Sequence, residues 1–477
     1  MSPDAVVVGA GPNGLAAAIT LARAGRTVEI YEGADRVGGG CRSETLTLPG
    51  YIHDVCSAVY PLVAVSPFFA DLPLSDHGLE LVYSPAQLVH PLDGQDPVVV
   101  GRSVEETAAS LGQDESAYLR LMQPLARAQE ALMKQFLGPF RLPRHPVATA
   151  AFGLRALRSA GGLAGSLFKG KRARAWLAGM AGHSMLPLDA SPSAGFGLML
   201  GLLCHSAGWP IARGGSQRIA DAMAAYLKSL GGEIHTSAPV ASIDDLPGAS
   251  VYLLDVTPRQ LVGIAGGRLP ERYINSLRRY RYGCGVFKID WALSEPVPWT
   301  SAVCRSSATL HLGGTLDEIA HAEKQVDRGE YPDRPFVLFS QPSLFDSTRA
   351  PAGGHTAWAY CHVPHGSGED MTEQIEAQVE RFAPGFRDVV AGRSTMNTGQ
   401  LQSHNPNLIG GDINGGRQDL TQLFTRPVAR VNPYTTPDPK LFLCSSSTPP
   451  GGGVHGMCGY FAARAALKRL RARAIAV

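Results

Sequence analysis

The sequence predicts an α/β fold, with a Rossmann-type dinucleotide-binding domain and a second, mixed α+β domain. Two glycine-rich turns lead to this prediction. One lies between a buried strand and a helix at residues 6–14, and the other, in the same arrangement, at residues 449–459. The third observation is the length of 477 residues, which exceeds what one compact core holds, so two or three domains are expected.

The opening turn has the spacing G-x-G-x-x-G after the strand Val6–Val8 and before a predicted helix at Leu15–Ala24. The first glycine makes the tight turn, the second lets a pyrophosphate approach the backbone, and the third lets helix and strand pack closely. The helix N-terminus adds unpaired N–H groups and a partial positive charge. The residues of this turn predicted to bind the cofactor are Gly9, Gly11, Pro12, Asn13 and Gly14.

The next strand, Thr27–Tyr31, ends in Glu32, eighteen positions after Gly14. An acid at about this distance accepts hydrogen bonds from the ribose hydroxyls of an adenosine. The loop EGADRVGGGCRS follows and places backbone and positive charge along a diphosphate, although a plain glycine-rich loop is the alternative. The cofactor-binding residues predicted here are Glu32, Gly33, Arg36, Gly39, Gly40, Cys41 and Arg42.

Composition excludes several classes of protein. A net charge of +2, with no aromatic–basic pattern, gives no attraction to nucleic acid. The eight cysteines contain no C-x-x-C pair, which argues against a dithiol centre and a cysteine metal site, so no metal is expected. Single cysteines fit a reducing compartment, and a strand that begins near residue 4 leaves no room for a signal peptide, so a cytoplasmic location is expected.

The middle of the chain is predicted to supply most of the second domain. Ser191–Ala212 is uncharged, but its dense apolar part is shorter than the roughly 18–20 residues that a membrane span needs. A buried helix lining an apolar pocket is therefore expected, with Phe196–Leu203 at its centre. Strand patterns such as Gly285–Leu293 and Pro335–Phe339, and a helix at Met371–Phe382, complete this domain.

The first domain is predicted to be discontinuous. Ile219–Leu230 has helical spacing and ends at a glycine pair, and Val251–Leu254 is typical of a strand. Short strands are also expected near Ile234, Val240 and Ile243, and Val240 is predicted to contact the cofactor. The cofactor domain is assigned residues 1–75, 214–265 and 400–477, and the substrate domain residues 76–213 and 266–399.

The closing turn, Pro449–Gly459, follows the strand Leu441–Cys444 and leads into a helix predicted at about 457–470. Two helix N-termini approached through glycines, one at each end of the chain, imply one long cofactor with phosphates and an electron-rich ring. FAD meets this description, because the dipole of the last helix would stabilise negative charge on the reduced flavin. The predicted contacts here are Gly453, Val454, His455, Gly456 and Met457.

The first block resembles FAD-dependent flavoproteins of the amine-oxidase type, and the whole layout resembles the non-carotenoid branch of the phytoene desaturase family. The segments that carry this resemblance are EGADRVGGGCRS, LPGYIHD, RGGSQRIADAM, HLGGTLDEI, RAPAGGHTAWAY, NPNLIGGDINGG and CSSSTPPGGGVHGMCGY. The resemblance implies an FAD-binding oxidoreductase with a discontinuous flavin domain. Cys444-Ser445 stands where many flavoproteins have Gly-Asp, and no catalytic acid or base of the desaturases can be carried over.

Two residues are the candidates for catalysis. His455 could handle a proton beside the flavin, or cap the last helix with a structural hydrogen bond. Arg213 could lie over the cofactor or form a surface pair. The H-x-x-H spacing of His362 and His365, near His355, invites a metal interpretation, but hydrogen-bonded histidines are favoured. Asp412, after a glycine pair, is expected to turn its loop.

The function predicted is removal of a hydride from a C–H bond of a hydrophobic small molecule to flavin N5, with reoxidation by oxygen, a quinone or another acceptor. The alternatives are a flavin-dependent isomerase, an NADPH-dependent reductase, and a binding protein without turnover. The basic, apolar segment Arg144–Arg174 is a candidate for peripheral membrane contact, and a solvated helical face is the alternative.

Overall fold

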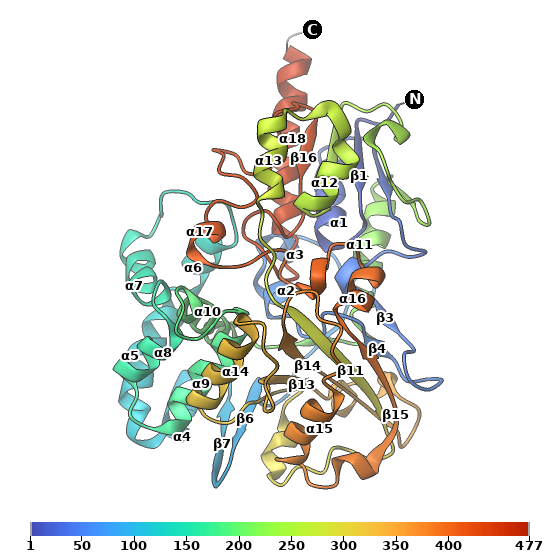
Figure 1. Cartoon of the computed structure of the whole chain (residues 1–477). Coiled ribbons are helices and arrows are strands. Elements are labelled where there is room, and N and C mark those ends of the chain that lie inside the picture. The colour runs from blue at the N-terminus through green and yellow to red at the C-terminus, as the bar shows by residue number, and fades with distance from the viewer. Residues whose placement is uncertain (1, 476–477) are drawn as a thin grey trace.

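Two β-sheets form the frame of the molecule (Figure 1). The computed structural model describes residues 2–475, and only the backbone of residues 266 and 472–475. The five-stranded sheet has the order β16-β10-β1-β2-β9 and lies near the chain termini, while the seven-stranded sheet, β15-β11-β14-β13-β12-β6-β7, lies at the opposite end.

The five-stranded sheet is parallel throughout. Its strands are β1 Ala5–Val8, β2 Val28–Tyr31, β9 Glu233–His235, β10 Val251–Leu254 and β16 Leu441–Leu443. Of these, β1, β10 and β16 are fully buried apolar runs, as expected for strands covered on both faces, whereas β2 and the edge strand β9 also carry polar residues. Alternate side chains of β1 separate two cores. Val7 packs with the helices α1 (Pro12–Ala22), α11 (Gln217–Ser229) and α18 (Met457–Ile475). Val8 packs with α12 (Pro258–Ala265) and α13 (Glu271–Arg278).

The seven-stranded sheet is antiparallel apart from the pair β6–β12. Its strands are β6 Leu88–Leu92, β7 Gln95–Val100, β11 Gly285–Leu293, β12 Thr309–Leu312, β13 Val337–Ser340, β14 His355–Val363 and β15 Val390–Met396. One face is apolar and packs against α15 (Thr372–Glu380) through residues such as Phe287, Ile289 and Trp291. The opposite face looks toward the first domain and carries polar side chains such as Lys288, Asp290 and Ser340 beside apolar ones such as Leu338 and Val286; we call it the polar face.

Helices fill the region beside this sheet (Figure 1). They are α4 Val104–Ser110, α5 Glu115–Arg127, α6 Gln129–Phe136, α7 Pro146–Ala156, α8 Ala160–Leu167, α9 Lys171–Gly182, α10 Ser193–Ser206 and α14 Leu316–Asp327. Helix α10 is the apolar helix expected from the sequence, and Leu198, Leu202 and Leu203 are completely buried in it. Within residues 2–475, no helix has the length and apolar character needed to cross a membrane.

Short elements connect the two domains. They are α2 Pro61–Val65, α3 Pro67–Ala70, α16 Thr398–His404 and α17 Leu420–Leu423, with the strand pairs β3 Ser43–Glu44 and β4 His53–Asp54, and β5 Leu81–Val82 and β8 Ile211–Ala212. The strands of the parallel sheet fall within residues 1–75, 214–265 and 400–477, and those of the seven-stranded sheet within 76–213 and 266–399. The domain boundaries themselves stay a prediction.

The strands expected near Val240 and Ile243 are wrong. Val240 lies in a loop, and Ile243–Asp245 is a single 3₁₀ turn. The reason is a capping box: Ser242 Oγ accepts from the Asp244 N–H, and the Asp245 carboxylate accepts from the Ser242 N–H at 2.9 Å. These hydrogen bonds hold the backbone in a turn and compete with strand pairing.

Candidate functional site

The opening glycine turn is tightly packed between β1 and α1. Gly9 has φ +95°, a conformation that favours glycine. A Cβ atom on Gly14 would lie 2.0 Å from the Gly9 carbonyl oxygen, so only glycine lets the helix start this close to the strand. Gly39 lies over the same turn, since a Cβ there would be 3.0 Å from Gly11 Cα. The loop after Glu32 therefore closes on the first turn, as a diphosphate clamp requires.

The closing glycine turn meets the opening one. A Cβ on Gly459 would lie 1.8 Å from the carbonyl oxygen of Asn13, so α18 and α1 are in backbone contact near their N-termini. A Cβ on Gly456 would lie 3.1 Å from Ala16 Cβ. In Figure 1 the red helix α18 lies against the blue helix α1. Two positively polarised helix starts therefore stand side by side, and one extended ligand can reach both.

Glu32 lies at the end of β2, beside the opening turn. Its carboxylate accepts from the N–H of Ala10 at 2.6 Å and of Ala34 at 2.9 Å. The chain that leads to Val240 runs alongside, because the Ala238 N–H donates to the Glu32 carbonyl at 2.8 Å. Glu32 and Val240 thus belong to one edge of the site, where the adenosine end of a dinucleotide is expected.

Three further residues of this loop, Arg36, Cys41 and Arg42, have defined surroundings. Arg42 is buried; its Nε donates to the Gly39 carbonyl at 3.2 Å and a terminal nitrogen donates to the carbonyl of His404, and burial lowers the pKa of its guanidinium. Burial raises the pKa of the Cys41 thiol to about 12, so this thiol is a packed, uncharged group. Arg36 is more exposed and pairs with Glu44 at 2.8 Å.

Asp255 is a site residue that the sequence analysis missed. It follows β10, and its Oδ2 accepts from the Gly14 N–H at 2.8 Å, in the first turn of α1. The pKa of this carboxyl is raised to about 7, mainly by burial, with a smaller contribution from the charge of Glu32. The available signal was an acid directly after a buried strand, the same signal that identified Glu32.

His455 is completely enclosed by the closing turn. Its Nδ1 accepts from the Met457 N–H at 3.0 Å, and its Nε2 lies 3.2 Å from the Gly451 carbonyl oxygen, to which an Nε2–H donates. Burial lowers the pKa of the ring to about 4. These contacts are those of a helix cap, the alternative that the sequence left open, and the catalytic role of His455 stays a prediction.

Arg213 lies toward the surface and pairs with Glu80, with Nε 2.6 Å from a carboxylate oxygen. This pair is also the alternative that the sequence left open, and a catalytic role for Arg213 stays a prediction.

Asp412 turns its loop by accepting from the N–H of Gly283 at 2.8 Å and of Asn414 at 2.7 Å.

The three histidines of the metal alternative have other partners. His362 Nδ1 contacts the Glu323 carboxylate at 2.8 Å, and His365 Nδ1 lies 2.9 Å from the Gly283 carbonyl oxygen. His355 lies near Ser343, 3.5 Å from its hydroxyl. Within residues 2–475, no group of three or more His, Cys, Asp and Glu side chains is placed to hold a metal ion.

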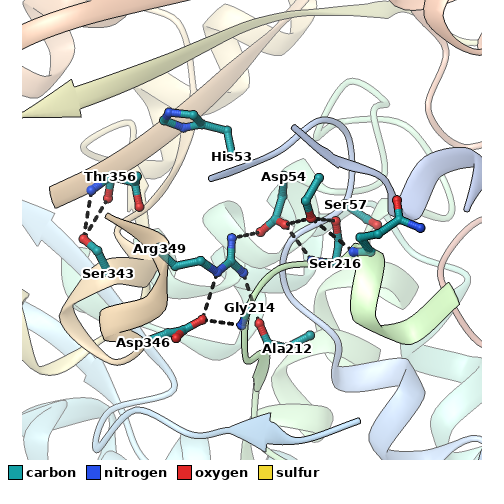
Figure 2. Close-up of polar contacts among 12 residues, drawn as sticks. His53, Asp54, Ser57, Ala212, Gly214, Ser216, Ser343, Asp346, Arg349 and Thr356 are labelled. Atoms are coloured by element: carbon teal, nitrogen blue, oxygen red, sulfur yellow. Dashed lines mark hydrogen bonds and ion pairs between the residues drawn. The ribbon is translucent and has the colours of Figure 1, made fainter. Parts of the chain in front are cut away.

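A buried arginine joins the two domains beside the site (Figure 2). Arg349 has no exposed surface and lies between two carboxylates, 3.0 Å from Asp54 and 2.9 Å from Asp346. The same carboxylates accept from the turn before α11: Asp346 from the Gly214 N–H and Asp54 from the Ser216 N–H, each at 2.7 Å. This network fixes β4 and the start of α11 against the substrate domain.

The polar face of the seven-stranded sheet carries a second set of residues that the sequence analysis missed. Lys288 and Asp290 alternate along β11, are nearly fully buried, and form an ion pair. His53 lies 3.5 Å from the second oxygen of Asp290, and burial lowers the pKa of its ring to about 3. The signal was a lysine and an aspartate at alternating positions of an otherwise apolar strand.

This face meets the first domain where the chain leaves the opening loop. Ala58 and Val59 pack against Trp358 and Tyr360 of β14. Tyr360 keeps part of its surface accessible although it lies in the middle of an inner strand, while its neighbour Cys361 is fully buried. The Tyr360 side chain, in register with Lys288, lies on the side of the sheet that faces the cofactor domain.

Comparisons with known proteins agree with this geometry. The model of the family "Flavin containing amine oxidoreductase" matches residues 13–262, more than half of the chain. The chain is 26% identical to pyridine nucleotide-disulfide oxidoreductase domain-containing protein 2 of Rattus norvegicus, with 98% of this chain and 94% of the relative covered. It is 25% identical to the neurosporene-forming phytoene desaturase of Rhodobacter capsulatus, with 95% and 92% covered.

A solved structure of putrescine oxidase bound to putrescine has the same fold, with a TM-score of 0.60, 21% identity and 100% of both chains covered. The fold class predicted from the sequence is therefore confirmed, as is the resemblance to amine-oxidase-type and phytoene desaturase proteins.

Proposed function

Since this chain belongs to the flavin containing amine oxidoreductase family and is an FAD-dependent oxidoreductase, we propose that it dehydrogenates an apolar small molecule. Bound FAD supplies the hydride acceptor. The single observation that carries the proposal is the backbone contact between α1 and α18 at Asn13 and Gly459, which unites the two glycine turns into one site. The residues proposed to hold the cofactor are those predicted in the two turns and after β2, together with Val240.

The substrate is proposed to lie between the closing turn and the polar face of the sheet. The surface left accessible at Tyr360 and Cys56 supports this position. Apolar side chains surround it, among them Met185, Val286 and Leu338. Such a lining favours a hydrophobic substrate, and the relative from Rhodobacter capsulatus is named as a desaturase of phytoene. The electron acceptor is proposed to be oxygen, a quinone or another oxidant.

A peripheral contact with a membrane is proposed for a surface near α7. We define the apolar patch as the exposed side chains Phe140, Leu142, Val147, Leu154, Leu157 and Phe424. The side chains of Phe140 and Leu142 are 83% and 89% exposed. Exposure of such large apolar side chains to water is unfavourable, and a cluster of them is unusual on a protein surface. Basic residues intersperse the patch: Arg141, Arg144, Arg155 and Arg158. This composition supports docking onto an anionic lipid surface, from which an apolar substrate would enter.

The patch only partly coincides with the segment expected from the sequence. Arg144–Arg174 is divided among α7, α8 and the start of α9, so it does not form one helical face. Val147, Leu154 and Leu157 of the patch lie within this segment, whereas Phe140, Leu142 and Phe424 lie outside it.

The direct test is reduction of the bound flavin under anaerobic conditions. Purified protein is loaded with FAD and mixed with alkanes, terpenes and amines, and bleaching of the flavin absorption is followed. We expect bleaching by at least one apolar compound. A folded, colourless protein that does not take up FAD would contradict the cofactor site, and a loaded flavin that no apolar compound reduces would contradict the proposed reaction.

A further inference from the structure

A row of polar side chains crosses the polar face of the seven-stranded sheet. Thr309 of β12 pairs in register with Ser340 of β13, Ser340 pairs with Trp358 of β14, and Trp358 pairs with Asp290 of β11. Residues directly opposite on adjacent strands have Cβ atoms roughly 4.5–5.5 Å apart and point to the same side of the sheet. The four side chains therefore form one continuous row, which we call the cross-strand row.

Each member of the cross-strand row has an unused hydrogen-bonding atom. Within the part of the chain that the structure describes, Thr309 Oγ1, Ser340 Oγ, Trp358 Nε1 and Asp290 Oδ1 are buried without a hydrogen-bond partner. The residues are at most 3% exposed. Buried polar atoms are almost always paired, and one left unpaired costs about 1–3 kcal/mol. Four in one row therefore indicate a site for a polar group from a ligand.

The row lies where the substrate is proposed to bind. Trp358 packs against Ala58 and Val59 of the cofactor domain, and Tyr360, two residues along β14, has accessible surface beside it. Lys288 lies over the Trp358 ring, 5.8 Å from its centre. A ligand that reaches the row thus contacts both domains.

The atoms of the row define the group that would satisfy them. The indole N–H of Trp358 can only donate, so the ligand must present an acceptor. From the described residues, Asp290 Oδ1 accepts no hydrogen bond: the Lys288 ammonium pairs with the other oxygen, and His53 Nδ1 lies 3.5 Å away without making a hydrogen bond to it. The ligand must therefore also present a donor. A hydroxyl group supplies both, and the Ser340 hydroxyl adapts to either role.

The charges around the row exclude the other common head groups. Lys288 and Asp290 neutralise each other as an ion pair, so neither a carboxylate nor an ammonium group would meet an unmatched opposite charge there. The Glu323 carboxylate is already in contact with His362 Nδ1 at 2.8 Å, and burial lowers the pKa of the His53 ring to about 3, which keeps it uncharged. A buried group without a matching charge is costly, so the head group is uncharged. A ketone would leave the free oxygen of Asp290 without a donor.

We propose that the substrate is an apolar molecule with an uncharged hydroxyl group, which accepts from Trp358 Nε1–H and donates to Asp290 Oδ1. This inference rests on the proposed function, because it places the hydroxyl in the same substrate site. Ser340, in register beside Trp358, completes the hydrogen bonds of that group, and the apolar side chains around Tyr360 hold the rest of the molecule.

The experiment compares probes of equal chain length on the FAD-loaded protein. Decane, decanol, decanoate and decylamine are titrated, and binding is followed through the flavin absorption spectrum. We expect decanol to bind about tenfold or more tightly than the other three, since each hydrogen bond contributes about 1–1.5 kcal/mol. The variants Trp358→Phe and Ser340→Ala should each remove most of this preference without weakening the binding of decane.

The matched control is Trp299→Phe. Trp299 is also buried, but its Nε1–H donates to Gln341 Oε1 within the apolar side of the sheet, so the variant should keep the preference for decanol. Equal binding of decane and decanol, or a preference unaffected in Trp358→Phe and Ser340→Ala, overturns the inference and leaves the row to ordered water. Bleaching by decane alone would then still support the proposed function. Decanol that binds selectively while no compound reduces the flavin would retain the inference and contradict the proposed reaction.

Discussion

Gly459 and Asn13 hold the last helix of the chain against the first: a Cβ on Gly459 would lie 1.8 Å from the Asn13 carbonyl oxygen. Because the clash would be with backbone, no rotamer change could relieve it. The two residues lie at opposite ends of the sequence, yet they determine the distance between the two glycine turns. The cofactor site therefore depends on a helix crossing as much as on the residues that line it.

Replacement of Gly459 by alanine should separate the two turns. We expect Gly459→Ala to lower the free energy of unfolding by about 3 kcal/mol or more, because overpacking against backbone forces the helices apart. The purified variant should also lose most of its FAD. Denaturant unfolding measures the loss of stability, and the ratio of flavin to protein absorption measures the loss of FAD.

Gly153→Ala is the control, since Gly153 lies in α7 with open space around it, and the variant should be neutral or more stable by up to about 1 kcal/mol. A Gly459→Ala protein with normal stability and FAD content would contradict this account of the crossing.

The parts of the site that the sequence predicts are local in the chain. The opening turn, Glu32 and the closing turn are each recognisable because a strand, a turn and a helix follow one another directly, and each glycine has a steric role that its neighbours require. That the two turns lie close together could be inferred from the sequence only indirectly, because one long ligand has to contact both of them.

The parts that were missed depend on how distant strands pair. Asp255 enters the site because β10 lies beside β1, and Thr309, Ser340 and Trp358 form a row only through the register of β12, β13 and β14. Thr309, Ser340 and Trp358 are unremarkable in their own segments, and Asp255 shows only the pattern of an acid directly after a buried strand. The strand order that unites them is set by packing between segments far apart in the sequence, which local periodicity does not encode.

Asp255 should make FAD binding depend on pH. The carboxyl has a pKa of about 7 in the folded protein, raised mainly by burial, against about 4 in the unfolded chain. Below pH 7 the carboxyl is mostly protonated and does not repel the diphosphate of FAD. Above pH 7 it is charged, on the same side of the site as the Glu32 carboxylate, and repels the diphosphate. We expect the dissociation constant for FAD to rise about tenfold from roughly pH 6 to pH 8.

Asp255→Asn is the matched variant, because its amide oxygen can still accept from the Gly14 N–H. It should bind FAD tightly at both pH values. In the protein without FAD, the contribution of Asp255 to stability should fall as the pH rises from about 4 to 7, since the folded state binds the proton more tightly, while buried histidines such as His455 contribute in the opposite direction. The stability of Asp255→Asn should therefore rise more with pH over this range than the stability of the wild type. Identical FAD affinities of the wild type at the two pH values would contradict the placement of Asp255.

Lys288 and Asp290 should be strongly coupled. Lys288→Met leaves the Asp290 carboxylate buried without its partner, which we expect to cost about 3–5 kcal/mol in the free energy of unfolding. The double variant Lys288→Met with Asp290→Asn should recover most of that loss. The exposed pair Arg278–Glu271 serves as control, since Arg278→Met should change stability by less than about 1 kcal/mol. Additive effects of the two substitutions at 288 and 290 would show that the pair is not coupled.

The apolar patch should bind anionic membranes. We expect the wild type to sediment with vesicles containing phosphatidylserine and to remain in solution with neutral vesicles, because both the exposed apolar side chains and the interspersed arginines contribute. Phe140→Ser with Leu142→Ser should weaken this binding about tenfold or more. Tyr331→Ser, at an exposed aromatic residue outside the patch, should leave it unchanged. Failure of the wild type to sediment with anionic vesicles would remove the membrane proposal.

His455 should act as a helix cap whose neutral form the fold requires. Burial lowers the pKa of the ring to about 4, against 6.5 in the unfolded chain, so its contribution to stability is complete above about pH 6.5 and is lost as the pH falls toward 4. His455→Asn retains an acceptor near Nδ1 for the Met457 N–H but cannot reach the Gly451 carbonyl. We expect His455→Asn to lose FAD and stability, with a weaker decline in stability over that pH range than the wild type shows.

In the fraction of the variant that retains FAD, substrate should reduce the flavin at a rate within about threefold of the wild type, because a cap takes no part in proton transfer. A loss of the hundredfold or greater size typical of a general acid or base, with full FAD content, would instead assign His455 to catalysis.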